Sequence, residues 1–228
     1  KKLHLGSSLV LPGLVNAHCH LELSYMRGVM SRWAGLPEFV REIGEKRPGT
    51  PDDERIRAAD VQQSLMRREG VVAVADICND PLLFPLKERS PIRFHNFIEL
   101  FGADPAQAPR ALAHGRLTAE RAAALGLSYS VTPHSTYSVS GPLWEGIVRE
   151  HPGNQPLSIH FMESPAQAPP FRDARPFSHL YRQLPGAGES NAPYRSPPGS
   201  PPATAPPASP LLLPHHTSVS SPDTQTLR

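Results

Sequence analysis

The sequence L-P-G-L-V-N-A-H-C-H-L-E, residues 11–22, decides how the rest of the chain is interpreted. Its apolar residues before the histidines are typical of a short buried parallel strand. Residues two apart on a strand point to the same face, so His18 and His20 would converge on one point. Imidazole nitrogens bind zinc, and catalytic zinc usually takes three protein ligands plus water. The stretch therefore predicts a strand that carries two metal ligands.

A single His-x-His pair is common in proteins that bind no metal, so further ligands must be sought along the chain. His134 follows an apolar run at residues 127–133, and His160 follows another at residues 156–159. Glu163 comes three residues after His160. Active sites of parallel α/β folds are built at the C-terminal ends of the strands. We therefore expect these side chains to lie near His18 and His20.

Strand-like and helix-like patterns alternate along the first 161 residues. After the first strand, strands are predicted at residues 71–75, 92–98, 127–133 and 156–161, and helices at 36–47, 51–69, 117–125 and 142–150. This alternation indicates βαβ units and a parallel sheet. Right-handed crossovers would bring all the C-terminal strand ends to one side. Asp76 and Glu99, which follow the second and third strands, would then gather with the histidines.

Composition indicates a protein of the cytoplasm whose main partner is neither nucleic acid nor an anionic membrane. The 228 residues include 23 basic and 21 acidic ones, which gives no electrostatic case for a nucleic-acid or membrane partner. Two cysteines, Cys19 and Cys78, suit a reducing compartment. Cys19 alternates away from the histidine face, so it is expected in the core rather than on a metal. No apolar run reaches the roughly 20 residues of a membrane helix, and nothing indicates the oligomeric state.

Proline divides the chain into two unlike parts. Of the 28 prolines, 15 lie at or after Pro165. Residues 1–184 are predicted to form one α/β domain, with a last weak helix at 171–184. Residues 185–228 are rich in Pro, Ser, Ala and Thr, and they offer too little apolar surface to offset the entropy of ordering. We expect them to form a disordered tail.

Three motifs, in order, resemble those of the amidohydrolase superfamily. P-G-L-V-N-A-H-C-H-L-E-L-S, residues 12–24, resembles its first metal motif. T-P-H-S-T-Y-S-V-S, residues 132–140, resembles its A-P-H-x-x-Y-S-x-S segment, and S-I-H-F-M-E-S, residues 158–164, its H-x-x-E segment. The likeness spans roughly residues 8–184 and fades after Glu163. The most similar group is the cytosine-deaminase-like and chlorohydrolase-like branch, which includes aminodeoxyfutalosine deaminases.

The resemblance implies a role for each motif residue. His18, His20 and His160 would hold one divalent ion, Zn²⁺ or Fe²⁺, and Glu163 would act as general acid and base. His134 resembles a substrate-contacting histidine, and Glu22 and Tyr137 would also face the substrate. Together they imply a hydrolase of non-peptide carbon–nitrogen bonds. Metal-activated water would deaminate a cyclic amidine or a nucleobase-like substrate.

The family barrel has eight strands, whereas this sequence supplies five. The expected fold is therefore an incomplete TIM-like (β/α)8 barrel with about five βα units. The family's sixth-strand histidine and eighth-strand aspartate have no counterpart in the sequence. The abrupt change in composition suggests a truncated or frameshifted reading after about residue 175.

Three other interpretations stay open at this stage. A ring hydrolase that releases chloride would use the same motifs. A catalytically dead remnant would bind metal without turnover. An interaction protein could work through the tail, where R-S-P-P-G-S-P at residues 195–201 matches a polyproline-ligand pattern.

Overall fold

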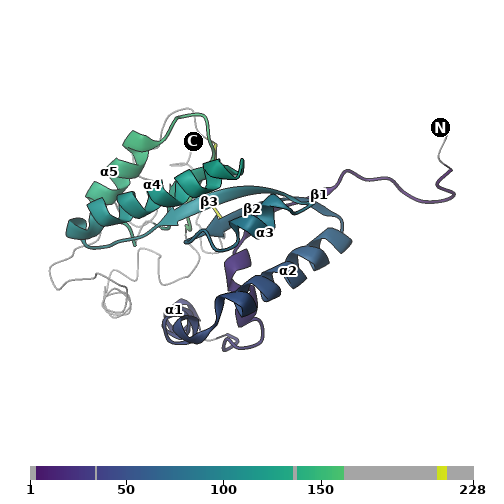
Figure 1. Ribbon diagram of the computed structural model, residues 1–228, viewed down its shortest axis with the longest axis horizontal. Helices are drawn as coiled ribbons and strands as arrows, with labels where there is room; N and C mark the ends of the chain where they lie inside the picture. Colours follow the sequence, from purple (N-terminus) through teal and green to yellow (C-terminus); the bar gives the residue numbers. More distant parts are fainter. Residues whose placement is uncertain (1–3, 34, 136–137, 162–209, 215–228) are drawn as a thin grey trace, which may run out of the picture.

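The computed structural model describes residues 4–33, 35–135, 138–161 and 210–214, and at its centre is a parallel β-sheet (Figure 1). Four strands lie side by side in chain order: β1 (Leu14–Cys19), β2 (Val71–Cys78), β3 (Arg93–Leu100) and β4 (Ser128–Pro133). All three neighbouring pairs are parallel. The predicted α/β class is confirmed, and every strand ends at the same edge of the sheet.

Helices connect the successive strands, and the sequence predicted four of the five described α-helices. They are η1 (Leu21–Met26), α1 (Gly35–Lys46), η2 (Arg47–Gly49), α2 (Asp52–Arg68), α3 (Phe84–Glu88), η3 (Pro105–Gln107), α4 (Ala108–Ala124) and α5 (Gly141–Glu150). Helix α4 begins well before the predicted Leu117, because Pro109 lies in its first turn, where no N–H is needed. Helix α3 is too short to give a periodic pattern. None of the described helices is long and apolar enough to cross a membrane.

The next strand, β5 (Leu157–Ser158), joins the sheet through a side chain rather than a regular backbone ladder. Thr132 Oγ1 accepts a hydrogen bond from Ser158 N at 2.8 Å and donates one to Ser158 O. The N–H of His160 donates to His134 O at 2.8 Å. The predicted fifth strand is thus present beside β4, and its direction carries His160 to the C-terminal edge of the sheet.

A segment of the proline-rich region forms a further strand, β6 (Leu211–Leu212), parallel to β5. The N–H groups of Leu157 and Ile159 donate to the carbonyls of Pro210 and Leu212, at 2.9 and 3.1 Å. Proline lacks an N–H but still accepts hydrogen bonds, so the flanking prolines do not prevent this pairing. At residues 210–214 the expectation of disorder therefore does not hold. The rest of the tail, and the helix predicted at 171–184, lie outside the described residues.

The sheet has a helix face and an opposite face. On β3, Phe94, Ile98 and Leu100 belong to apolar clusters with the helices, so alternation places Glu99 on the opposite face. On β2, Asp76 shares the helix face and forms a buried ion pair with Lys87 of α3. The expectation that Asp76 gathers with the histidines is therefore wrong.

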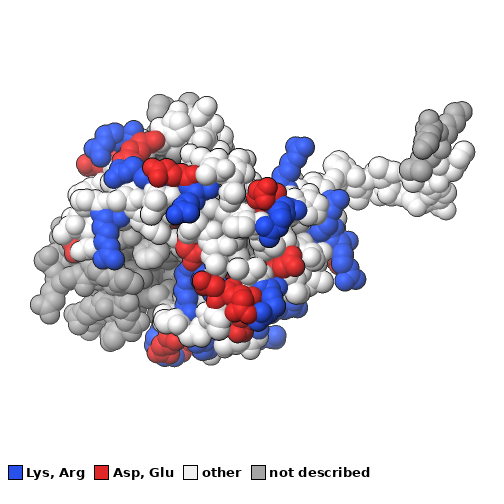
Figure 2. Space-filling model, in the orientation of Figure 1, with Lys and Arg blue, Asp and Glu red and all other residues white. Residues whose placement is uncertain are grey.

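Charged side chains of both signs are interspersed on the face seen in Figure 2. Several form ion pairs along or between helices, including Arg57 with Asp53 and Arg116 with Glu150. Exposed pairs of this kind each contribute between about 0 and 1 kcal/mol. The fold therefore depends on the buried clusters rather than on these surface charges.

Packing between α4 and α5 can be tested at Gly146. A Cβ atom there would lie 2.4 Å from Leu112 Cδ1, and Leu112 belongs to a buried cluster. We expect Gly146→Val to lower the free energy of unfolding by about 1–3 kcal/mol. Gly44→Val in α1 meets no atom within 4 Å and shares the same change in helix propensity. Urea denaturation should show little effect of Gly44→Val, and equal effects of both changes would contradict the packing.

Candidate metal centre

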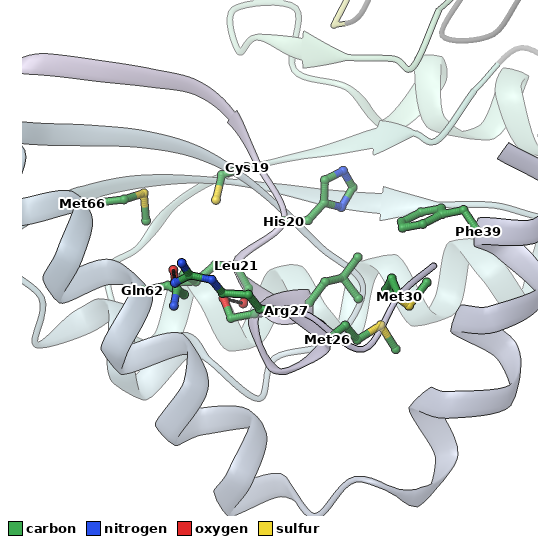
Figure 3. Close-up of a pocket in the computed structure, with 11 residues that line it drawn as sticks. Cys19, His20, Leu21, Met26, Arg27, Met30, Phe39, Gln62 and Met66 are labelled. Carbon is green, nitrogen blue, oxygen red and sulfur yellow. Dashed lines mark hydrogen bonds between the residues drawn. The ribbon is translucent and has the colours of Figure 1, made fainter. Parts of the chain in front are cut away.

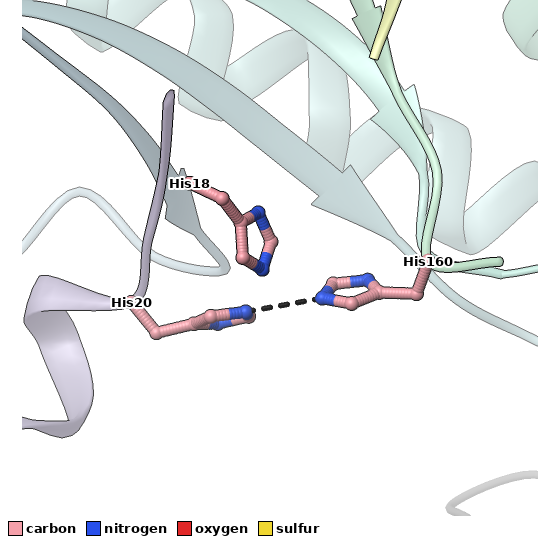
Figure 4. A group of neighbouring side chains, drawn as sticks. All are labelled: His18, His20 and His160. Carbon is pink, nitrogen blue, oxygen red and sulfur yellow. Dashed lines mark hydrogen bonds between the residues drawn. The ribbon is translucent and has the colours of Figure 1, made fainter. Parts of the chain in front are cut away.

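Three histidines from distant parts of the sequence meet at the C-terminal edge of the sheet (Figure 4). His18 lies on β1, His20 directly follows it, and His160 follows β5. One ligand nitrogen from each lies within 4.8 Å of the others. The predicted ligand set is thus brought together, although His20 and His160 are 140 residues apart in sequence.

The end of β1 turns its two histidines toward each other. Asn16 pairs with Val74 and Cys19 with Asp76, so one extra residue of β1 is accommodated between these pairs. Such a bulge re-aims side chains. The ring centroids of His18 and His20 lie 5.0 Å apart. The two-residue period predicted this convergence, and the register shift lies between Asn16 and Cys19, next to both histidines.

The distance between His20 and His160 suits a tetrahedral ion. Their Nε2 atoms lie 3.1 Å apart. With metal–nitrogen bonds of about 2.0–2.1 Å, two ligands of tetrahedral zinc lie about 3.3 Å apart. Burial lowers the pKa of His20 to about 3, so this imidazole is neutral at pH 7. Neutral imidazole is the form that binds a metal.

His160 is held in a defined orientation by acceptors on its other ring nitrogen. Its Nδ1 lies 3.1 Å from His134 O and 3.2 Å from Glu99 Oε1. Two acceptors at Nδ1 place the ring proton there and leave the Nε2 lone pair directed at His20. A carboxylate or carbonyl behind a histidine is the usual support of a metal ligand. The residues present therefore fit a divalent ion held by His18, His20 and His160.

Glu99 is a buried carboxylate at the centre of this arrangement. Burial raises its pKa, but His134 and His160 outweigh that effect and hold the pKa well below its ordinary value. Asn79 Nδ2 donates to Glu99 Oε2 at 3.1 Å. Glu99, His134 and His160 also form a second group whose ligand atoms lie within 4.8 Å of one another. Glu99 can therefore orient His160 or take part in binding the ion.

The predicted substrate residues lie in different surroundings. His134 is beside the metal ligands, with its ring centroid 4.8 Å from that of His160, and its Nδ1 lies 2.6 Å from Ser138 Oγ. Glu22 is buried, accepts from Asn79 N at 2.8 Å and pairs with Arg47 at 3.3 Å. Burial raises the pKa of Glu22 to about 7, although Arg47 opposes this. Tyr137 and Glu163 lie outside the described residues.

The sequence alone did not assign a role to Glu99 or Asn79, which are hydrogen-bonded to each other beside the histidines. Glu99 was recognisable as a polar residue at a strand end, but no motif marked it as a partner of His160. Asn79 links Glu22 to Glu99 through its backbone N–H and its side-chain amide. No pattern signals Asn79, because its position depends on the loop after β2. Cys19 packs toward the helix side, as predicted, and burial raises its pKa to about 12, so its thiol stays protonated.

An apolar pocket of about 380 Å³ adjoins the histidine cluster (Figure 3). It lies between η1, α1 and α2, and His20 forms part of its wall. Three methionines, Met26, Met30 and Met66, line it together with Phe39. Methionine side chains are flexible and polarisable, so such a lining adapts to ligands of different shape.

No protein-family model and no curated protein matches this sequence. Several solved structures match the fold. Guanine deaminase from C. acetobutylicum with bound guanine has a TM-score of 0.62 at 15% identity, covering 95% of this chain and 51% of its own. Helicobacter pylori aminofutalosine deaminase with methylthio-coformycin has a TM-score of 0.59 at 20% identity, covering 67% and 38%. Zinc-bound atrazine chlorohydrolase from Arthrobacter aurescens has a TM-score of 0.54 at 20% identity, covering 77% and 44%.

The chain has the fold of these hydrolases. Its alternating βα units match part of the fold of these enzymes, so the predicted incomplete TIM-like barrel is confirmed. The chain spans between 38% and 51% of the length of the three structures. At these identities the likeness concerns the fold, and the activity of the chain is a separate question.

Metal binding should depend on the clustered histidines. We expect His18→Ala and His20→Ala each to weaken zinc binding by more than about 100-fold, which exceeds the typical cost of losing an outer partner of a ligand. His4→Ala, at an exposed position near the N-terminus, is the control and should bind zinc as the unchanged protein does. Calorimetric zinc titration measures the difference. Equal affinities in all three variants would exclude this cluster as the metal site.

Proposed function

We propose that this chain carries the metal centre of a hydrolase that acts on non-peptide carbon–nitrogen bonds. The supporting observation is the cluster of His18, His20 and His160 at the C-terminal edge of a parallel sheet, with Glu99 behind His160. Three imidazoles are a ligand set of catalytic zinc, and Fe²⁺ is the alternative ion. When bound, the ion would supply the Lewis acidity that lets water act as a nucleophile near neutral pH.

The residues around the ion would hold the substrate and move protons. Glu99 accepts from Asn79 and fixes the ring of His160. His134, whose ring lies next to that of His160, is a proposed contact of a ring substrate. Glu22 and Tyr137 are further substrate contacts in this proposal. Glu163, three residues after His160, is the proposed carrier that takes a proton from water and gives it to the leaving amine.

The substrate proposed is a small cyclic amidine or nucleobase-like amine, and ammonia is the leaving group. Deaminases of aminofutalosine and guanine share the fold, which supports this class, and atrazine chlorohydrolase shares it too, so release of chloride is the alternative. The pocket lined by Met26, Met30, Met66 and Phe39 would take an apolar part of the substrate, because His20 lies both in its wall and in the metal cluster.

Metal binding without turnover is a second candidate. The chain spans about half or less of the length of the catalytic enzymes that share its fold. A complete (β/α)8 barrel builds its active site from the loops that follow all eight strands. A protein with the three histidines alone could hold an ion and still lack the groups that complete catalysis.

Ammonia release by the zinc-loaded protein separates the two candidates. With a panel of aminopurines and aminopyrimidines, we expect turnover that a chelator abolishes. Glu163→Gln should keep the zinc and lower turnover by about 10²–10⁴-fold, because it removes the proton carrier and preserves its shape.

Glu69→Gln, at an exposed position after α2, is the matched control and should be fully active. Full zinc loading without ammonia from any compound would favour the non-catalytic candidate. Unchanged turnover in Glu163→Gln would remove Glu163 from the mechanism.

A further inference from the structure

A fully buried ion pair lies behind the metal centre, on the helix face of the sheet. Lys87 Nζ lies 2.6 Å from Asp76 Oδ2, and both side chains are 0% exposed. Lys87 also donates to Asn96 Oδ1 at 2.7 Å. Replacing a buried ion pair by well-packed apolar residues is often neutral or stabilising. Stability alone therefore does not explain why charges are kept at this position.

The second carboxylate oxygen of Asp76 connects the pair to the metal ligands. Asp76 Oδ1 accepts from the backbone N–H of Leu21 at 2.8 Å. Leu21 is the residue directly after His20, where the chain leaves β1 and enters η1. The β1–β2 pairing ends at Cys19 opposite Asp76, so no strand partner holds the backbone at Leu21. The carboxylate supplies that missing acceptor.

We propose that Asp76, held in place by Lys87, is a positioning residue that fixes the backbone of His20 and so sets the geometry of the metal centre. Asn96 holds the ammonium group of Lys87, and Lys87 in turn keeps the carboxylate of Asp76 from rotating. The carboxylate anchors Leu21, and this anchor keeps His20 Nε2 at 3.1 Å from His160 Nε2. The inference rests on the proposed metal centre but not on any particular reaction.

Two double variants separate the anchor from the charge pair. Asp76→Asn/Lys87→Met and Asp76→Leu/Lys87→Met both remove the two charges, but only the first leaves an oxygen that can accept from Leu21. We expect the variant with leucine to bind zinc roughly 10–100-fold more weakly, the usual effect of losing an outer partner of a ligand. The variant with asparagine should bind zinc nearly as tightly as the unchanged protein.

Amide hydrogen exchange at Leu21 gives a second measurement, which can be made on the unchanged protein and on both variants. If the anchor and the ion favour the same backbone geometry, zinc binding should slow exchange at Leu21, because coupling between two events is reciprocal. Exchange at Leu21 should be faster in the variant with leucine than in the variant with asparagine. Thr118→Val is the control, because Thr118 is a buried polar residue on α4, away from the ion pair. It should leave zinc affinity and Leu21 exchange unchanged.

Equal zinc affinity in the two double variants would overturn the proposal. The proposal would also be overturned if zinc bound to the unchanged protein without altering amide exchange at Leu21. This measurement does not depend on whether any variant folds. Absence of zinc binding by the unchanged protein would overturn both this inference and the metal centre. Zinc binding with the expected difference, but without ammonia release, would contradict the proposed reaction alone.

Discussion

The parallel direction of the strands is the constraint on which the histidine cluster depends. Crossovers return the chain to the same side each time, so β1, β3, β4 and β5 all end at one edge. This brings His18, Glu99, His134 and His160 together from distant parts of the sequence. The helices pack on the face that alternates away from Glu99, so the polar cluster and the apolar clusters do not compete for the same space.

His160 is fixed because β5 and the residues after it are hydrogen-bonded to a neighbour on each side. Successive N–H groups of residues 157–160 donate to Pro210 O, Thr132 Oγ1, Leu212 O and His134 O. The donors thus alternate between β6 and β4, and each buried group finds a partner. A metal ligand on an edge strand would otherwise move with that edge. The Thr132 side chain and the β6 carbonyls give His160 a backbone fixed from both sides.

The sequence predicted the strands and the histidine cluster but not the face on which each polar residue lies. Apolar runs and turn residues indicate where a buried strand begins and ends. Such a strand has apolar residues on both faces, so its sequence has no alternation from which to read the inward side. Asp76 and Glu99 therefore looked equivalent, although one faces Lys87 and the other His160. Asn79 and β6 depend on contacts between distant segments, which no local pattern records.

The carboxylates of Asp76 and Glu99 differ in the positively charged group that lies beside each of them. Both are almost fully buried, and a buried carboxylate needs a compensating positive charge. Asp76 has the ammonium group of Lys87, a permanent cation at 2.6 Å. The described ion-pair partner of Glu99 is His160, an imidazole that binds a metal only in its neutral form. His134 also lowers the pKa of Glu99, and Asn79 donates a hydrogen bond to this carboxylate. A divalent ion held by His18, His20 and His160 would add positive charge close to Glu99, so a buried carboxylate at this position suits the proposed metal centre.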